Sequence, residues 1–237
     1  MSYLSHIGAY LVEKKPDVVV HLGDHFDFPS LSSYDVGKRQ FEGRRYKADV
    51  EAGNKGMELL LAPLKQYNAN AVKNHKERYK PRMVFLWGNH EQRQQRAVDS
   101  DAKLEGTIGP HELALDDWEV HPFLEVVTIE GVAFSHYLVS GVMGRPITSA
   151  AAILAKRHMS AVVGHQQGKQ VAHANRADGK QMTAVILGSS YPHEEEYLGV
   201  QGNTHFRGIM MMHEVQDGAF DESFISLDFL RQKYEEK

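Results

Sequence analysis

The 237-residue sequence predicts an α/β protein with two mixed sheets packed between helices, a four-layer α-β-β-α sandwich. Three observations predict it. The first half alternates helical apolar spacing with short β-branched runs, and the second half consists mainly of strand-like segments separated by turns. No Pro/Gly/Ser-rich linker or internal repeat divides the chain, so we expect a single domain over residues 1–237.

The expected elements of the first half are a helix over 3–14, a strand over 18–22, a loop over 26–34, a long helix over 38–67, a mobile polar insert over 68–82, a strand over 83–87, and helical segments over 91–104 and 110–115. Pro16 separates the first helix from its strand, which stops at Gly23. Gly43, Gly53 and Gly56 weaken the long helix. The insert has too few apolar residues to be part of a core.

In the second half we expect a hairpin over 125–137, a helix over 149–158, and strands over 161–163, 171–175, 182–188, 207–215 and 221–229. Glu130-Gly131 marks the turn of the hairpin, and Gly164 ends the strand that follows the helix. Asp217-Gly218 marks a turn between the last two strands.

Composition narrows the functional classes. No apolar stretch is long enough to span a bilayer and the N-terminus lacks a signal-peptide profile, so we expect no membrane association and a cytoplasmic location. The absence of cysteine excludes disulfides and thiolate metal sites, whereas 14 histidines leave imidazole as a ligand. Net charge is −4, but residues 1–104 carry 17 Lys/Arg against 13 Asp/Glu, so a polyanionic partner is conceivable there beside the simpler reading of solvated faces.

Metal-type ligands follow four of the apolar runs. Four residues that could bind a metal each stand at a predicted strand end: Asp24, Asn89, His136 and His165. All but His136 directly follow a glycine, which leaves the backbone free to turn. A carboxylate can bridge two cations, an amide supplies a neutral oxygen, and imidazoles supply nitrogen. This mixed set suits manganese, iron, zinc, cobalt or nickel better than calcium or a soft metal.

Four short motifs occur in the chain in this order: Gly23-Asp24, Gly88-Asn89-His90-Glu91, Ser135-His136 and Gly164-His165. The sequence thereby resembles the calcineurin-like metallophosphoesterase superfamily, in its nuclease- and phosphodiesterase-like branch. The resemblance implies that Asp24 bridges two metals and that Asn89, His136 and His165 bind the second one. It implies that His90 faces the substrate, where it could act as an acid, and Asn89 is a further candidate for phosphate contact. Arg93, three residues beyond His90, could reach a phosphate or could equally be an exposed surface arginine. Asp27 resembles a further acidic position behind the site.

The sequence departs from the family pattern in two places. The family's first strand, which carries Asp-x-His, is absent, and the closing Gly-His-x-His reads Gly164-His165-Gln166-Gln167. Gln167 could still offer its carbonyl oxygen, and His25 and His193 are less favoured substitutes. We therefore expect one well-occupied metal site and a second that is weak or absent. The missing strand would also expose the edge of the strand at 18–22, which favours a homodimer.

The resemblance implies a metal-dependent hydrolase of phosphate esters, in which an activated hydroxide attacks phosphorus. The Gly-Asp-x-x-Asp form and the basic first half favour a phosphodiester, with DNA or RNA as candidate substrates. The alternative is a metal-binding but catalytically impaired or truncated member of the family.

Overall fold

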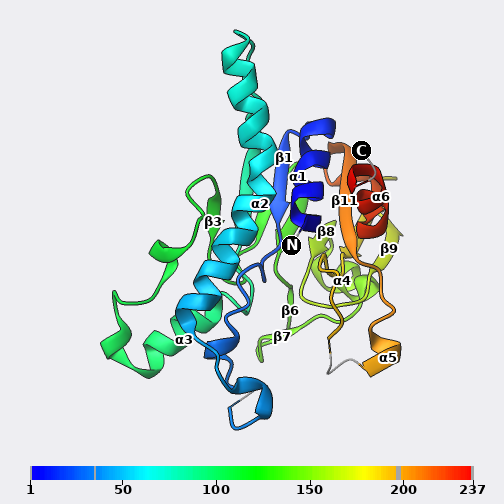
Figure 1. Cartoon of the computed structure of the whole chain (residues 1–237). Coiled ribbons are helices and arrows are strands. Elements are labelled where there is room, and N and C mark those ends of the chain that lie inside the picture. Colours follow the sequence, from blue (N-terminus) through cyan, green and yellow to red (C-terminus); the bar gives the residue numbers. More distant parts are fainter. Residues whose placement is uncertain (1, 35, 196–198, 236–237) are drawn as a thin grey trace. The chain divides into compact units, whose positions relative to one another are not determined.

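The computed structural model describes residues 2–34, 36–195 and 199–235 (Figure 1). The chain divides into two compact units, unit 1 over Met1–Phe123 and unit 2 over Leu124–Lys237. Each unit has its own sheet and its own apolar cluster. The sequence predicts a single domain over residues 1–237, and the division into two units does not test that prediction.

Unit 1 is built on a parallel three-stranded sheet in the order β1-β2-β3. Its elements are α1 (Ser2–Lys14), β1 (Val18–His21), the 3-10 turns η1 (Pro29–Leu31) and η2 (Arg39–Phe41), α2 (Tyr46–Lys73), β2 (Arg82–Leu86), α3 (Gln92–Ser100), the turns η3 (Ala102–Leu104) and η4 (Pro110–Glu112), and β3 (Glu119–His121). Since β1 and β2 run in parallel, the residues that follow them meet at one edge of the sheet. Strand β1 is an edge strand of this sheet, and its pairing with another chain stays a prediction.

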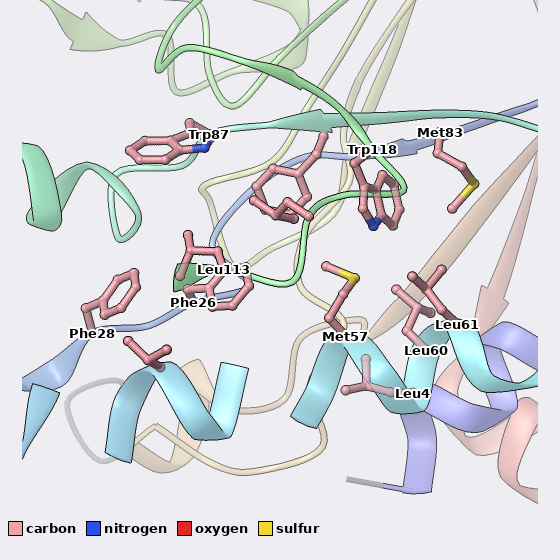
Figure 2. Packing of buried hydrophobic residues seen from close by; sticks show 13 residues of the cluster. Leu4, Phe26, Phe28, Met57, Leu60, Leu61, Met83, Trp87, Leu113 and Trp118 are labelled. Atoms are coloured by element: carbon pink, nitrogen blue, oxygen red, sulfur yellow. The ribbon is translucent and has the colours of Figure 1, made fainter. Parts of the chain in front are cut away.

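The core of unit 1 lies between its sheet and the apolar face of α2. Met57, Leu60 and Leu61 share one face of the helix at helical spacing and belong to the same buried cluster as Met83 and Trp118 (Figure 2). This packing fixes the long helix against the sheet whose strand ends carry predicted ligands.

Gly53 of α2 makes room for the loop that follows β1. A Cβ at this position would lie 2.1 Å from the ring of Phe26, a fully buried side chain. The glycine that weakens the helix in sequence terms therefore allows the loop to approach α2 closely.

We expect Gly53→Ala to lower the free energy of unfolding by about 1–2 kcal/mol, because overpacking exceeds the gain in helix propensity. Urea unfolding would measure it. Gly168→Ala is the control, because a Cβ there meets nothing within 4 Å. Equal unfolding midpoints for the two variants would contradict the close approach.

Unit 2 is built on a mixed five-stranded sheet in the order β4-β5-β8-β10-β9, with β5, β8 and β10 parallel. Its elements are β4 (Val127–Ile129), β5 (Val132–Ser135), β6 (Val139–Ser140), β7 (Arg145–Pro146), α4 (Ala150–Arg157), β8 (Ala161–Val163), β9 (Gln170–Asn175), β10 (Gln181–Ile186), α5 (Gly199–Gly202), β11 (Gly208–Gln216), β12 (Ala219–Ser226) and α6 (Leu227–Glu235). Helix α4 begins at the Ser149 N-cap, whose hydroxyl accepts from the Ala152 amide. Its buried Ile153 and Leu154 pack in one cluster with Val163 and Ile186 of the sheet.

The structure confirms the α/β class and the hairpin that turns at Glu130-Gly131, where both residues have left-handed φ. Several boundaries were wrong, and the helix expected over 110–115 is only the 3-10 turn η4. The helix expected from residue 38 begins at Tyr46, because Gly43 takes a φ of 79° that breaks helical geometry. The strand expected over 221–229 ends at Ser226, and the buried Leu227 and Leu230 belong to the helix that follows.

The mobile insert expected over 68–82 is also wrong in its first part, since residues 68–73 form the last turns of α2. The Asn68 side chain accepts from the Tyr79 amide and donates to the Tyr79 carbonyl, each at 2.9 Å. The Tyr79 hydroxyl in turn donates to the Pro16 carbonyl at 2.5 Å. These bonds fasten the segment to the residues in front of β1.

No helix in the described part of the chain is both long and apolar enough to cross a membrane.

Candidate metal and phosphate site

Asp24 stands directly after β1 and a sharp backbone turn. Gly23 has a φ of 90° and Asp24 a left-handed φ of 55°. The neighbouring strand end approaches closely, since a Cβ at Gly88 would lie 2.1 Å from Asp24 Oδ1. Only glycine at position 88 therefore leaves room for this carboxylate.

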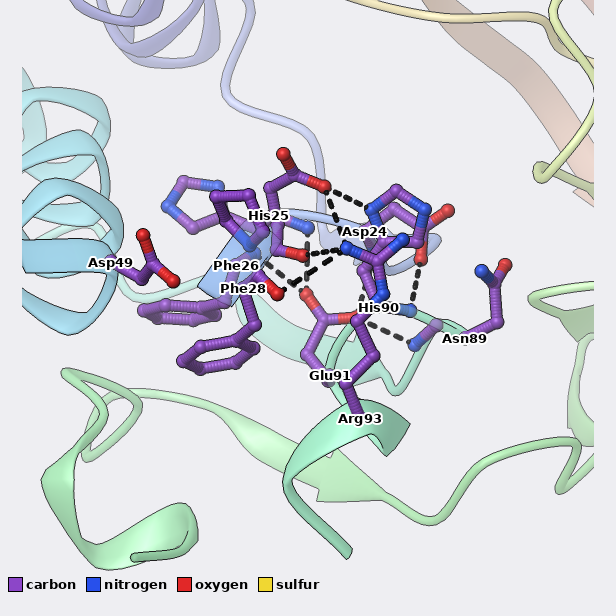
Figure 3. Close-up of polar contacts among 12 residues, drawn as sticks. Asp24, His25, Phe26, Phe28, Asp49, Asn89, His90, Glu91 and Arg93 are labelled. Atoms are coloured by element: carbon purple, nitrogen blue, oxygen red, sulfur yellow. Dashed lines mark hydrogen bonds and ion pairs between the residues drawn. The ribbon is translucent and has the colours of Figure 1, made fainter. Parts of the chain in front are cut away.

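Glu91 holds the two strand ends of unit 1 together (Figure 3). Its side chain is fully buried. One carboxylate oxygen accepts from the Asp24 and Gly88 amides, both at 2.9 Å. The other accepts from the His25 amide at 2.7 Å and the Phe26 amide at 2.8 Å. One buried carboxylate thus satisfies four backbone donors and fixes the direction of Asp24.

His90 pairs with Asp27 beside Asp24. Nδ1 of His90 lies 2.6 Å from Oδ1 of Asp27, and the His90 amide donates to Oδ1 of Asp24 at 3.0 Å (Figure 3). A histidine whose Nδ1–H is held by a carboxylate has a fixed orientation and presents Nε2 for proton transfer.

The two members of this pair favour the charged state of each other. Burial lowers the pKa of His90, but the hydrogen bond with Asp27 and the charge of Asp24 outweigh it, so the pKa lies above the ordinary 6.5. Burial raises the pKa of Asp27, whereas the hydrogen bond and charge of His90 and the Arg93 guanidinium bring it below its usual value. Each charged group therefore stabilises the other in the metal-free protein.

We expect the His90 pKa in metal-free protein to exceed 6.5 and to fall in Asp27→Asn, as NMR titration of the ring protons would show. Since the folded-state pKa is raised, the stabilisation it gives is complete below the unfolded pKa and is lost as pH rises through the folded value. The ring signals of the exposed His111 serve as an internal reference in the same spectra. A His90 pKa unchanged by Asp27→Asn would contradict the pairing.

Arg93 and Asn89 both take part in hydrogen bonds within the protein. Nη1 of Arg93 donates to the Asp27 carbonyl at 2.5 Å and lies 3.3 Å from its carboxylate. Arg96 donates to the Asn89 carbonyl at 3.0 Å. Arg93 thus supports the loop that carries Asp27, and its contact with a substrate phosphate stays a prediction.

His25 is engaged elsewhere. Its Nε2 lies 3.0 Å from the Gly53 carbonyl. Burial lowers the pKa of His25, and the bond to Gly53 opposes this only in part. A neutral ring that donates from Nε2 into α2 is a structural histidine, which weakens its case as a substitute ligand.

In unit 2, His136 and His165 follow the neighbouring parallel strands β5 and β8. Their ring centroids lie 5.2 Å apart at an interplanar angle of 73°. The Gly164 amide donates to the His136 carbonyl at 3.0 Å and ties the two strand ends together. His165 adopts a left-handed φ of 65°, a conformation that residues at functional sites often carry. His136 is 1% exposed.

Gln167 contacts Tyr191 in the same unit. The Tyr191 hydroxyl donates to the Gln167 side-chain oxygen, the atom that would have to bind a metal. Tyr191 also stacks on His193, with ring centroids 4.3 Å apart. The Gln167 contact favours an anchoring role over the ligand role considered from the sequence.

Within unit 1, therefore, Asp24, Asn89, His90 and Arg93 gather around two strand ends; within unit 2, His136 and His165 do the same. The clamp made by Glu91 and the hydroxyl contact of Tyr191 were missed by sequence reasoning. Glu91 lies in Gly-Asn-His-Glu, so its position was visible, but its four amide partners are set by the fold.

Comparisons with family models, with curated proteins and with solved structures found no significant match for this chain.

Proposed function

We propose that the chain is a metal-dependent phosphoesterase that hydrolyses a phosphodiester, with Asp24, Asn89, His136 and His165 as metal ligands. The observation that carries this proposal is the His90–Asp27 pair, which lies beside the Asp24 carboxylate at the end of two parallel strands. An oriented histidine acid beside a carboxylate that can bind a metal could protonate the leaving oxygen of a phosphate ester.

The donor set fits a divalent transition metal, with Mn²⁺ foremost. In this proposal, carboxylate and amide oxygens from unit 1 and imidazoles from unit 2 would together supply the mixed nitrogen and oxygen set that such ions prefer. The spacing of the His136 and His165 rings, 5.2 Å between centroids, suits two imidazoles on one ion. When bound, the ion would stabilise charge on the phosphoryl oxygens and activate water for attack.

The residues of the chain then have distinct roles. Asp24 is held by its turn and by the His90 amide, so it needs little reorganisation to bind. His90 would give the Nε2 proton to the leaving oxygen, while Asp27 stabilises the charged ring through Nδ1. Arg93 keeps Asp27 in place.

The Gly-Asp-x-x-Asp form, with its second aspartate on His90, supports a diester substrate, and DNA or RNA is the diester that we favour. In this proposal the sheets of the two units would form the central layers of a four-layer α-β-β-α sandwich.

The test is hydrolysis of bis-p-nitrophenyl phosphate against p-nitrophenyl phosphate, with Mn²⁺ and after removal of metal by a chelator. We expect cleavage of the diester that requires metal and that His136→Ala abolishes. His158→Ala, at an exposed helix end in the same unit, is the control.

Calorimetric Mn²⁺ binding without hydrolysis would favour the alternative, a metal-binding protein that does not turn over. The Gln167–Tyr191 contact supports that reading, because it occupies the side-chain oxygen proposed for a further metal. Absence of both binding and hydrolysis would reject both candidates.

A further inference from the structure

The hairpin formed by β6 and β7 in unit 2 carries an apolar tip. Its strands, Val139–Ser140 and Arg145–Pro146, are joined by Gly141-Val142-Met143-Gly144. Val142 is 101% exposed and Met143 is 75% exposed. Single exposed apolar residues are common on protein surfaces, but two adjacent ones at the end of a hairpin are a distinct feature.

Two glycines open the backbone on either side of this tip. Gly141 and Gly144 have left-handed φ values of 65° and 66°, and a Cβ at either position would meet nothing within 4 Å. The pair of apolar side chains is therefore presented away from the described atoms of the unit.

The base of the hairpin is basic. Lys156 donates to the Ser140 hydroxyl at 2.5 Å, and Arg157 donates to the Val139 carbonyl. Arg145 belongs to β7 and is exposed. These three cations form a collar below the apolar tip.

The surrounding sequence carries no opposing charge. Residues 131–177 contain no Asp or Glu at all, although residues 105–237 as a whole carry 10 Lys/Arg against 18 Asp/Glu. The acid-free stretch includes the hairpin, its cationic collar and the proposed metal ligands His136 and His165. A polyanion that met the hairpin would therefore meet no acidic side chain from this stretch of the sequence.

We propose that this hairpin binds a nucleic acid duplex, with Val142 and Met143 wedged at a base step and Arg145, Lys156 and Arg157 on the flanking phosphates. The inference rests on the proposed function and names its substrate as duplex nucleic acid. Apolar wedges inserted at flexible steps, with cations on the backbone, are a known means of gripping a duplex. An anionic membrane is less favoured, because two apolar side chains give little area for insertion.

The experiment uses a short DNA duplex with 2-aminopurine at a central thymine–adenine step, in chelator so that the strands are not cut. For the full chain we expect binding by anisotropy and a rise in 2-aminopurine fluorescence as the step unstacks. Val142→Ser/Met143→Ser should abolish the rise and weaken binding roughly tenfold. Val200→Ser is the matched control, because this valine of unit 2 is 90% exposed.

The collar has its own readout. Lys156→Ala/Arg157→Ala should lower the slope of log affinity against log salt by about 2, whereas Arg231→Ala on α6 should leave it unchanged. Circular dichroism melts would show that each variant is folded.

Three results would overturn the inference: no duplex binding by the full chain, unstacking retained in Val142→Ser/Met143→Ser, or binding to phosphatidylserine vesicles in place of the duplex. Hydrolysis of bis-p-nitrophenyl phosphate by the unmodified chain tests the proposed function separately. Hydrolysis without duplex binding rejects this inference alone, and duplex binding without hydrolysis rejects the proposed function alone.

Discussion

Glu91→Ala is expected to lower the free energy of unfolding by about 3–5 kcal/mol, because it leaves buried backbone donors without an acceptor. In the unmodified protein these donors are the amides of Asp24, His25, Phe26 and Gly88. Chemical denaturation monitored by tryptophan fluorescence would measure the change, since Trp87 and Trp118 both belong to the buried cluster of unit 1.

Glu91→Gln separates support of the site from support of the fold. The amide keeps the size of the side chain but offers one oxygen where the carboxylate offers two, and its NH2 group faces backbone donors. We expect the variant to fold and to bind Mn²⁺ roughly tenfold more weakly by calorimetry, since Asp24 loses its fixed direction. Glu77→Ala, at an exposed glutamate of unit 1, is the control. Unchanged stability in Glu91→Ala, or unchanged Mn²⁺ affinity in Glu91→Gln, would contradict the role of this clamp.

His90→Ala is expected to reduce cleavage of a dinucleotide, a phosphodiester whose alkoxide leaving group needs a proton, by about 10²–10⁴-fold, the usual worth of a positioned general acid. Mn²⁺ binding should persist, because His90 is not among the proposed ligands. Asp27→Asn should give a smaller loss, since the ring remains but its orientation and charge are less well supported.

The leaving group gives the sharper readout. A dinucleotide, whose leaving alkoxide needs a proton, should suffer more from His90→Ala than bis-p-nitrophenyl phosphate, whose p-nitrophenolate departs without one. His111→Ala is the histidine control. If His90→Ala cleaved both esters at the unmodified rate, the acid role would be wrong.

Strand ends were the part of the site that sequence reasoning could predict. The apolar runs before Gly23 and Gly164 became β1 and β8, since β-branched runs stopped by glycine leave little choice of structure. The expectation that glycine weakens the long helix was an incomplete guide to its role. Gly53 lowers the helix propensity of α2, yet it is where the buried ring of Phe26 packs, so tertiary contact outweighs local preference.

The remainder of the site depends on contacts between distant residues. The Gln167 side chain contacts Tyr191, and Arg93 contacts Asp27, only because the fold brings these distant segments together. No local pattern distinguishes an arginine that binds a phosphate from one that supports a loop, because both need the same side chain. The role of such an arginine depends on the residues that it contacts, and those contacts are set by the topology of the fold.

The hydrogen bonds that hold Tyr79 affect the entropy of anion binding by its basic neighbours. The Asn68 side chain, in the last turns of α2, hydrogen-bonds to the backbone of Tyr79, and the Tyr79 hydroxyl donates to the Pro16 carbonyl. The neighbouring Lys76, Arg78 and Lys80 therefore extend from a backbone that is already ordered. An anion that met these cations would restrict side-chain rotamers but little main chain, so its association would carry a smaller entropic cost than binding to an unstructured basic tail.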